Sequence, residues 1–348
     1  TPAHIRQAAI EALNAGQTRY PSPASGLAVA RKAVCESLAR DAKLRYSPEQ
    51  VIITSGGKDA AYMAFHALLD PGDEVVIPKP YWVSYPEMVR LAGGVPVFAV
   101  GPEKNDYKLT PEVLRSALTP RTRMFILNTP SNPSGVTYHP EEVRALAQVL
   151  QERDLIVLSD EIYDRLLYDG QKTMSYAAVG ERAYAQTLTC NSASKTYAMT
   201  GWRLGYAAGP VEIIKAMAKL QSQSTSGAAT FSQIAYATAL SADQACVATM
   251  RAEFERRGAH MWRRLTAMSG VRCPKPTGAF YCFPNVSAAY AKLGVRGSIE
   301  FAARLLEEAR VAVVPGEAFG MDEHVRLSFA TGMQQIDKGL DRIETFLR

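Results

Sequence analysis

The sequence predicts an α/β protein, with one large domain built on a mainly parallel sheet flanked by helices and a smaller C-terminal α+β domain. Short, nearly continuous apolar runs alternate with segments of helical apolar spacing through the first part of the chain, which is typical of strands buried on both faces. The alternation weakens after about Gly209, and mixed α and β patterns return over 271–348. A length of 348 residues also suits two domains of about 100–200 residues each.

The first clear unit is a strand, a glycine turn and a helix. Val51–Thr54 is a short apolar run that ends in Ser55-Gly56-Gly57. Helical spacing follows over Asp59–Leu69, and Pro71-Gly72-Asp73 ends that helix. Further strands are predicted at six apolar runs: Glu74–Ile77, Val95–Val100, Met124–Leu127, Leu155–Leu158, Thr187–Thr189 and Leu204–Ala208. Further helices are predicted at Pro140–Arg153, Val211–Leu220 and Cys246–Met268.

Composition and charge exclude several classes of protein. The hydrophobic fraction of 47% and the charged fraction of 21% are ordinary for a globular chain. No stretch approaches the ~18–20 uncharged apolar residues that would span a bilayer. The net charge of +5 is spread along the chain, which is too weak a signal to indicate nucleic-acid binding.

Cysteine and histidine usage gives no sign of a cross-linked or metal-binding fold. The five cysteines are an odd number without a CxxC pair, so neither a disulfide scaffold nor a structural zinc site is indicated. The five histidines are scattered without the spacing of metal ligands, and we expect no metal centre. A reducing cytoplasm is the expected compartment. Because the first residue is Thr1, the absence of a targeting segment adds little to that expectation.

Open parallel sheets bind ligands at the carboxyl ends of their strands, so polar residues there are the candidates for chemistry. One candidate is Ser55-Gly56-Gly57-Lys58-Asp59, where backbone N–H groups and a helix dipole could bind an anion. The spacing of a Walker loop is missing, and an ordinary tight turn is the simpler interpretation. Lys58 favours an anion, because a cation at a helix N-terminus opposes the dipole unless an anion lies nearby.

Asp160 follows a predicted buried strand and is a second candidate. A carboxylate there could ligate a metal, act as a base or pair with a protonated ring nitrogen. The alternative is a helix cap for Glu161–Leu166. Tyr163, three residues later, would lie on the same helical face if the segment forms a helix.

Two basic residues form a third group. Lys195 ends Ser192-Ala193-Ser194-Lys195, directly after a predicted strand. A lysine among small residues there could have a depressed pKa and attack carbonyls, although a solvated surface charge is the common alternative. Arg203 lies between apolar residues before the next strand, where its charge calls for an anion, and phosphate matches a guanidinium fork.

Arg326 is the fourth candidate, in the predicted strand 325–329. Val325, Leu327 and Phe329 share one face of that strand, which leaves Arg326 and Ser328 on the other. Arg326 is either an exposed strand residue or a clamp for a carboxylate. No Ser/His/Asp or Cys/His arrangement and no HExxH motif is found.

Several of these features occur in one order along the chain: Asn132-Pro133-Ser134-Gly135, Asp160-Glu161-Ile162-Tyr163, Ser192-Ala193-Ser194-Lys195, Arg203 and Arg326. This series resembles the class I aminotransferases, the fold-type I group of enzymes that depend on pyridoxal 5′-phosphate (PLP). The resemblance covers essentially the whole chain and is nearest to bacterial aspartate aminotransferases with Gly-Gly-Lys in the phosphate loop. Other stretches that resemble the family are Pro80–Pro86, Met199–Arg203, Pro276–Tyr281 and Val313–Gly316.

The resemblance implies a role for each matching residue. Lys195 carries PLP as a Schiff base and then moves a proton between the substrate Cα and the cofactor. Asp160 pairs with the pyridinium nitrogen, so that the ring can accept electrons from a carbanion. Tyr163 and Asn132 bind the phenolic oxygen of the cofactor and lower the pKa of the Schiff base. Trp82 stacks on the ring face and also lines the substrate site.

The two anionic groups of cofactor and substrate are assigned in the same way. Ser192, Arg203 and the Gly57–Lys58 turn bind the phosphate, and Arg326 grips the α-carboxylate of the substrate. Tyr20 resembles the tyrosine that reaches the phosphate of the neighbouring subunit, which implies a homodimer with sites at the interface. The partners expected are therefore an amino acid, a 2-oxo acid and a second copy of the chain.

Aspartate is the expected amino donor and 2-oxoglutarate the expected acceptor, with Lys58 as the cation for the distal carboxylate. Aromatic donors or prephenate are an alternative, since related enzymes share these motifs. A PLP-dependent carbon–sulfur lyase and a PLP-binding sensor domain are more distant alternatives. The resemblance also implies a large PLP-binding domain over 1–262 and a small domain over 263–348, whose N-terminal part we expect to precede Thr1.

Overall fold

A central sheet of seven strands forms the larger part of the molecule. The computed structural model describes residues 1–348. The strands of this sheet are β1 (Val51–Thr54), β2 (Glu74–Lys79), β3 (Val95–Val100), β4 (Thr122–Asn128), β5 (Ile156–Asp160), β6 (Thr187–Ser192) and β7 (Gly205–Ala208), in the order β1-β7-β6-β5-β4-β2-β3. Only β7 runs antiparallel to its neighbours, β1 and β6. The mainly parallel sheet predicted from the sequence is confirmed.

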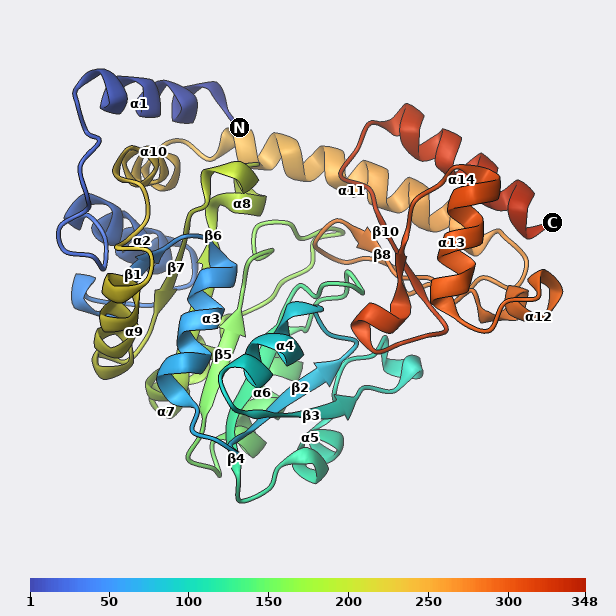
Figure 1. Cartoon of the computed structure of the whole chain (residues 1–348), viewed down its shortest axis with the longest axis horizontal. Coiled ribbons are helices and arrows are strands. Elements are labelled where there is room, and N and C mark those ends of the chain that lie inside the picture. The colour runs from blue at the N-terminus through green and yellow to red at the C-terminus, as the bar shows by residue number, and fades with distance from the viewer.

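Helices cover both faces of this sheet (Figure 1). One face packs against α3 (Gly57–Leu68), α4 (Ser84–Leu91) and α9 (Val211–Gln223). The other face packs against α2 (Ala28–Asp41) and α10 (Thr230–Ser241) toward β1, and against α5 (Pro111–Ala117), α6 (Pro140–Leu150) and α7 (Glu181–Gln186) toward β3. Helix α1 (Ala3–Asn14) packs on α10. Short 3-10 helices lie at Pro48–Gln50, Glu103–Asn105, Tyr176–Val179, Thr200–Trp202, Ser287–Ala289 and Gly316–Phe319.

The apolar runs of the sequence have this form because side chains of a strand alternate between two covered faces. Ile52 packs into the core under α3, whereas Val51 and Ile53 pack into the opposite core under α2 and α10. Both sets must be apolar, which explains why β1 has no polar residue before Thr54.

A second, smaller core surrounds a three-stranded antiparallel sheet in the order β8-β10-β9, as expected for the C-terminal part of the chain. Its strands are β8 (Tyr281–Cys282), β9 (Val314–Pro315) and β10 (Val325–Ser328). The helices of this part are α11 (Ala245–Thr266), α12 (Tyr290–Leu293), α13 (Ser298–Ala309) and α14 (Met333–Leu347). The α/β class with a second α+β part is confirmed.

Helix α11 connects the two parts (Figure 1). Its first turn places Val247 in the core beside the large sheet, and its last turns place Met261 and Leu265 in the core of the small sheet. The domain boundary predicted between residues 262 and 263 falls inside this helix and stays a prediction. None of the helices is both long enough and apolar enough to span a membrane.

Candidate active site

The candidate site lies where parallel strands of the large sheet end. Asn128, Asp160 and Ser192 are the last residues of β4, β5 and β6. Asn128 is paired in register with Asp160, which is in turn opposite Cys190. The strand pairing therefore brings residues from three distant parts of the sequence to one edge of the sheet.

The carboxyl group of Asp160 is partly buried at this edge. Burial raises the pKa of Asp160, while hydrogen bonds from the Tyr85 hydroxyl and from the backbone N–H of Ile162 and the charge of Lys195 act in the opposite direction. The segment 161–166 forms turns instead of the helix that the capping alternative required. Asp160 is thus a partly buried carboxyl group with hydrogen-bond donors and a cation around it. Tyr85 is a partner that the sequence did not predict.

Lys195 follows the end of β6 in a single helical turn, α8 (Ala193–Thr196). The side chain of Ser192 accepts a hydrogen bond from the N–H of Ser194 at 3.1 Å, which caps this turn. The cap fixes the direction in which Lys195 leaves the backbone. The side chain of Lys195 is half-buried rather than solvated.

The amine of Lys195 lies within the fields of three charged residues. Burial lowers the pKa of Lys195, the positive charges of Arg326 and Arg203 lower it further, and Asp160 opposes them. The Nζ atom is 5.4 Å from the ring centroid of Phe280. A lysine in these surroundings loses its proton more readily than a surface lysine and can act as a nucleophile or a base.

A glycine turn and an arginine form a cradle beside this lysine. Helix α3 begins at Gly57, and Gly56 has a φ of +104°. The guanidinium of Arg203 donates hydrogen bonds to the carbonyls of Ser55 at 3.1 Å and Thr200 at 3.0 Å. A Cβ atom at Gly56 would come within 2.4 Å of that guanidinium, so only glycine fits. The start of α3 and Arg203 together present N–H donors at one point, as an anion requires.

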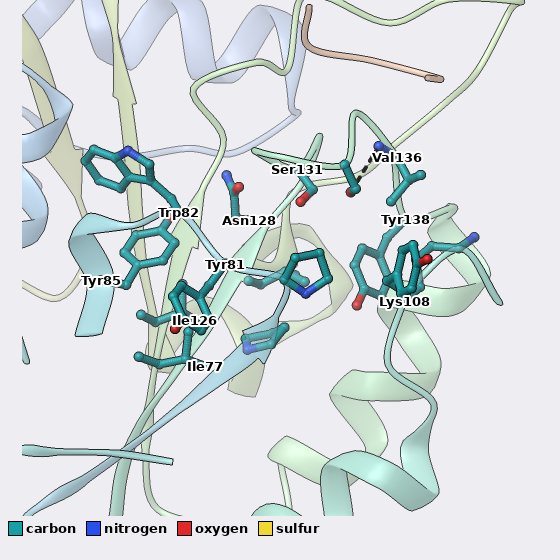
Figure 2. Close-up of a pocket in the computed structure, with 15 residues that line it drawn as sticks. Ile77, Tyr81, Trp82, Tyr85, Lys108, Ile126, Asn128, Ser131, Val136 and Tyr138 are labelled. Atoms are coloured by element: carbon teal, nitrogen blue, oxygen red, sulfur yellow. Dashed lines mark hydrogen bonds between the residues drawn. The ribbon is translucent and has the colours of Figure 1, made fainter. Parts of the chain in front are cut away.

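Trp82 links this cradle to Asp160. The Nζ atom of Lys58 is 5.1 Å from the centroid of the Trp82 ring. Trp82 also packs edge-on against Tyr85 at 5.1 Å, and Tyr85 donates to Asp160. Figure 2 shows Trp82 and Tyr85 beside Asn128, on the wall of a pocket at the ends of β2 and β4. Trp82 and Lys58 thus lie together, and the roles predicted for them stay predictions.

Arg326 extends from the small sheet toward the large one. Its Nη1 donates to Oδ1 of Asn132 at 2.9 Å. The guanidinium carbon lies close to two aromatic rings, 4.5 Å from the centroid of Tyr281 and 4.9 Å from that of Phe319. Its Nε is buried and has no hydrogen-bond partner. A planar cation that is oriented by aromatic rings and has a free donor suits the bidentate binding of a carboxylate.

Tyr163 lies in the turn after β5 and is buried. Its hydroxyl is 2.8 Å from the hydroxyl of Tyr281, in β8 of the small sheet. Burial raises the pKa of Tyr163 well above its ordinary value, so the phenol stays protonated and can donate one hydrogen bond. Tyr281 is a second buried neighbour that was not predicted as a site residue.

Comparison with known proteins places this constellation in a family. The model of the family described as aminotransferase class I and II matches residues 1–343. The chain belongs to this family. The aspartate aminotransferase of Geobacillus stearothermophilus is 48% identical over 347 residues, which are 100% of this chain and 88% of the relative. The aspartate/prephenate aminotransferase of Cereibacter sphaeroides is 45% identical over 99% of this chain and 88% of the relative.

Solved structures agree with this assignment. The structure of aspartate aminotransferase from Thermus thermophilus with maleate has a TM-score of 0.93 and 44% sequence identity, and the match covers 99% of this chain and 88% of that one. The family resemblance and the predicted enzyme class are therefore confirmed. This aminotransferase has the fold of its relatives over the full described length.

In this aminotransferase, most of the predicted site residues are linked pairwise by contact or charge near the carboxyl-terminal edge of the large sheet: Lys58 with Trp82, Arg326 with Asn132, and Lys195 with Asp160, Arg203 and Arg326. Tyr20 differs from the others: its side chain is 84% exposed and forms no hydrogen bond within the chain. Its predicted contact with a neighbouring subunit stays a prediction. The residues that the sequence did not single out are Tyr85, Phe280, Tyr281 and Phe319. The family-like stretches Pro80–Pro86 and Pro276–Tyr281 contain all of them except Phe319.

Proposed function

We propose that this aminotransferase binds PLP covalently at Lys195 and transfers the amino group of aspartate to 2-oxoglutarate. The observation that carries the proposal is the position of Lys195. Its amine is half-buried at a strand end, and two arginines and an aspartate act on its pKa. This combination supports both tasks of the lysine, because attack on a carbonyl and abstraction of a proton each require a neutral amine.

The residues present fit the cofactor. Asp160 is a partly buried carboxylate that can pair with a protonated ring nitrogen. The start of α3 and the Arg203 guanidinium provide N–H donors for a phosphate, and the turn leaves no room for a side chain at Gly56. The Trp82 indole provides an aromatic face and the Tyr163 phenol a donor for the phenolic oxygen. We assign these residues, together with Ser192 and Asn132, to cofactor binding.

When bound, PLP supplies the electron sink that stabilises negative charge at the substrate Cα. The protein positions the reacting atoms and moves the proton. Lys195 Nζ would remove the proton from the substrate Cα and deliver it to C4′ of the cofactor. Asp160 keeps a proton on the ring nitrogen, since a buried anion makes loss of that proton unfavourable. Tyr163 would donate a hydrogen bond from its hydroxyl group and so stabilise negative charge on the phenolic oxygen.

Two cations support a dicarboxylate as substrate. Arg326 has a buried Nε without a partner, and a bidentate α-carboxylate would satisfy it. Lys58 lies over Trp82 and is the cation we assign to the distal carboxylate. The three proteins compared above are all named for aspartate, and one of them also for prephenate. Prephenate and aromatic donors are therefore the second candidate substrates.

We further propose a cytoplasmic homodimer in which Tyr20 reaches the phosphate site of the partner. The support is the exposure of this tyrosine, which extends from the loop after α1 with no partner in its own chain. An aromatic hydroxyl that is this exposed is typical of an interface residue.

The proposal is tested by the visible absorption spectrum of the purified protein, recorded before and after aspartate is added without 2-oxoglutarate. We expect the cofactor band to shift to that of the aminated cofactor and to return when 2-oxoglutarate is added. Lys195→Ala is the control, and neither change is expected in it. Arg263→Ala is a matched surface control that should behave as the parent.

Other outcomes would contradict specific parts of the proposal. A spectrum that does not respond to aspartate but responds to phenylalanine or prephenate would overturn the aspartate assignment. Release of ammonia and pyruvate, without formation of the aminated cofactor, would indicate β-elimination instead of transamination. Absence of a cofactor band in the reconstituted protein would overturn the assignment of Lys195.

A further inference from the structure

Tyr281 is the first residue of β8 and belongs to the small sheet, and its side chain is only 6% exposed. Its backbone pairs with that of Ser328 in β10, and Ser328 lies two residues after Arg326. A tyrosine buried in this way usually has a partner for its hydroxyl. Here the partner is another tyrosine, Tyr163, from the turn after β5 of the large sheet.

The two phenols form an isolated pair. Their oxygens are 2.8 Å apart, and neither hydroxyl has another hydrogen-bond partner in the chain. Each phenol has one proton to donate. Under the proposed function, Tyr163 uses its one O–H group to donate a hydrogen bond to the phenolic oxygen of the cofactor, so the hydrogen bond between the two tyrosines must be donated by Tyr281. A hydrogen bond received at the Tyr163 oxygen polarises its O–H group and strengthens the bond that Tyr163 donates.

The ring of the same tyrosine supports Arg326. The centre of the guanidinium lies 4.5 Å from the centroid of the Tyr281 ring, and Phe319 flanks it on another side at 4.9 Å. Stacking on an aromatic face orients the plane of an arginine. The ring of Tyr281 therefore helps to set the plane in which Arg326 can bind a carboxylate.

The backbone of Tyr281 makes a third contact, with the loop that contains Asn132. A Cβ atom at Gly135 would lie 2.6 Å from the carbonyl oxygen of Tyr281, and Gly135 has a φ of +71°. This loop therefore packs directly on β8 and leaves no space for a side chain. Asn132, three residues earlier, accepts the hydrogen bond from Arg326.

We infer that Tyr281 is a positioning residue that couples the carboxylate-binding Arg326 to the cofactor-facing Tyr163. This inference rests on the proposed function. The hydroxyl of Tyr281 acts on Tyr163 and the ring of Tyr281 acts on Arg326, so the two actions can be separated by substitution. Tyr281 also extends from the small sheet, whereas Tyr163 belongs to the large one. The pair thus joins the two parts of the molecule at the reacting centre.

The first test uses the pH titration of the visible band of the bound cofactor, measured without substrate. Tyr281→Phe keeps the ring and removes the hydroxyl. We expect the midpoint of the titration to rise by about half a pH unit, because a weaker donor at Tyr163 stabilises the anionic oxygen less. In a Tyr163→Phe background, the same substitution should leave the midpoint unchanged. An equal shift in both backgrounds, or no shift in either, would overturn the coupling to Tyr163.

The second test uses the binding of maleate, a dicarboxylate that cannot donate an amino group. Tyr281→Phe should bind it with the affinity of the parent, whereas Tyr281→Leu, which lacks the aromatic face, should bind it about tenfold more weakly. Equal affinities for Tyr281→Leu and the parent would overturn the role toward Arg326. Near-ultraviolet circular dichroism of each variant distinguishes a local effect from a loss of packing.

The two tests also distinguish this inference from the proposed function. If the parent has no titrating cofactor band, the proposed function fails, and the maleate measurement alone decides the part that concerns Arg326. If the parent titrates and Tyr281→Phe does not shift the midpoint, the proposed function stands and the inference about Tyr281 fails.

Discussion

The hydroxyl of Tyr85 donates a hydrogen bond to Oδ2 of Asp160, from a phenol that is almost completely buried. Burial raises the pKa of Asp160. Among the interactions that lower this pKa, the hydrogen bond from Tyr85 is the largest. Tyr85 lies one helical turn after Trp82 and packs edge-on against it. One short segment therefore positions both an aromatic face and the carboxylate.

Replacement of Tyr85 by Phe tests this relationship. Without the phenol, the pKa of Asp160 should rise further, so that less of the carboxylate is charged at a given pH. We expect kcat to fall about tenfold, since a hydrogen bond to a charged group contributes ~1.5–3 kcal/mol. The acidic limb of the pH–rate profile should move to higher pH. Tyr176→Phe is the matched control, because the hydroxyl of Tyr176 is buried without a partner.

Arg326→Lys keeps the charge of Arg326 but removes its forked geometry. We expect KM to rise by at least tenfold for every amino acid and 2-oxo acid, since all of them share the α-carboxylate. Arg296→Lys, at an exposed ion pair with Glu300, is the control and should leave KM unchanged. A variant with altered kcat and an unchanged KM would contradict the role assigned to Arg326.

Lys58→Met separates the two roles proposed for Lys58. If Lys58 binds the distal carboxylate, KM should rise about tenfold for aspartate and 2-oxoglutarate and stay constant for phenylalanine. If Lys58 binds the cofactor phosphate instead, the affinity for the cofactor should fall and all donors should be affected alike. Steady-state kinetics with both donors and a cofactor titration decide between these outcomes. Lys215→Met, at an exposed pair with Glu212, is the control.

His324 makes the stability of the protein depend on pH. Its side chain is 2% exposed, and its Nε2 is 2.7 Å from the hydroxyl of Tyr107, a loop residue of the large part. Burial lowers the pKa of His324 to about 4. The unfolded chain therefore binds this proton more readily, and the free energy of unfolding should fall as pH decreases from 6.5 to about 4, by roughly 3 kcal/mol.

The measurement for His324 is urea-induced unfolding at pH 7, 5.5 and 4.5 in the parent and in His324→Gln. Glutamine does not titrate, so the variant should lose less stability than the parent over this range. Glu323, Glu103 and Arg272 also act on this histidine and are unchanged in both proteins. Parallel pH dependences would show that His324 is not the group responsible.

Glu161 should make the stability of the protein depend on pH in the opposite direction to His324. Its buried carboxyl accepts hydrogen bonds from Ser159 and Ser175, at 2.7 and 2.6 Å. Burial raises the pKa of Glu161 to about 7. The folded state therefore favours the protonated form, and stability should fall as pH rises from about 4.5 to 7. The measurement compares the free energy of unfolding of Glu161→Gln with that of the parent, by urea unfolding at pH 4 and at pH 8. The difference in favour of the variant should be ~3 kcal/mol larger at pH 8 than at pH 4.

The strands were largely predictable, because each is a nearly uninterrupted apolar run. Val51–Thr54 was predicted with the bounds that β1 has. Leu155–Leu158 was predicted too short at its carboxyl end, since β5 continues to Asp160 through pairing with β4 and β6. Helix α10 was not predicted: most of its residues are buried, so it shows no regular polar face.

The site was predicted where a residue lies next to a strand end, as Lys195 and Asp160 do. Tyr85 and Tyr281 could not be found in that way. Their hydroxyl partners are 75 and 118 residues away along the chain, and no local pattern marks a tyrosine for such a contact. The order of strands in the sheet could not be predicted for the same reason. It depends on which elements pack together in the fold and not on their spacing along the chain.

The antiparallel strand β7 has a consequence for how the protein is made. It lies between β1 and β6, so the turn at Gly56 touches Gly205 and Arg203, and the latter is 148 residues from its acceptor Ser55. A nascent chain on the ribosome lacks one wall of this cradle until more than half of its residues have been translated. The phosphate that we propose for this turn can therefore bind only late in biosynthesis, after the first and last strands of the large sheet have paired.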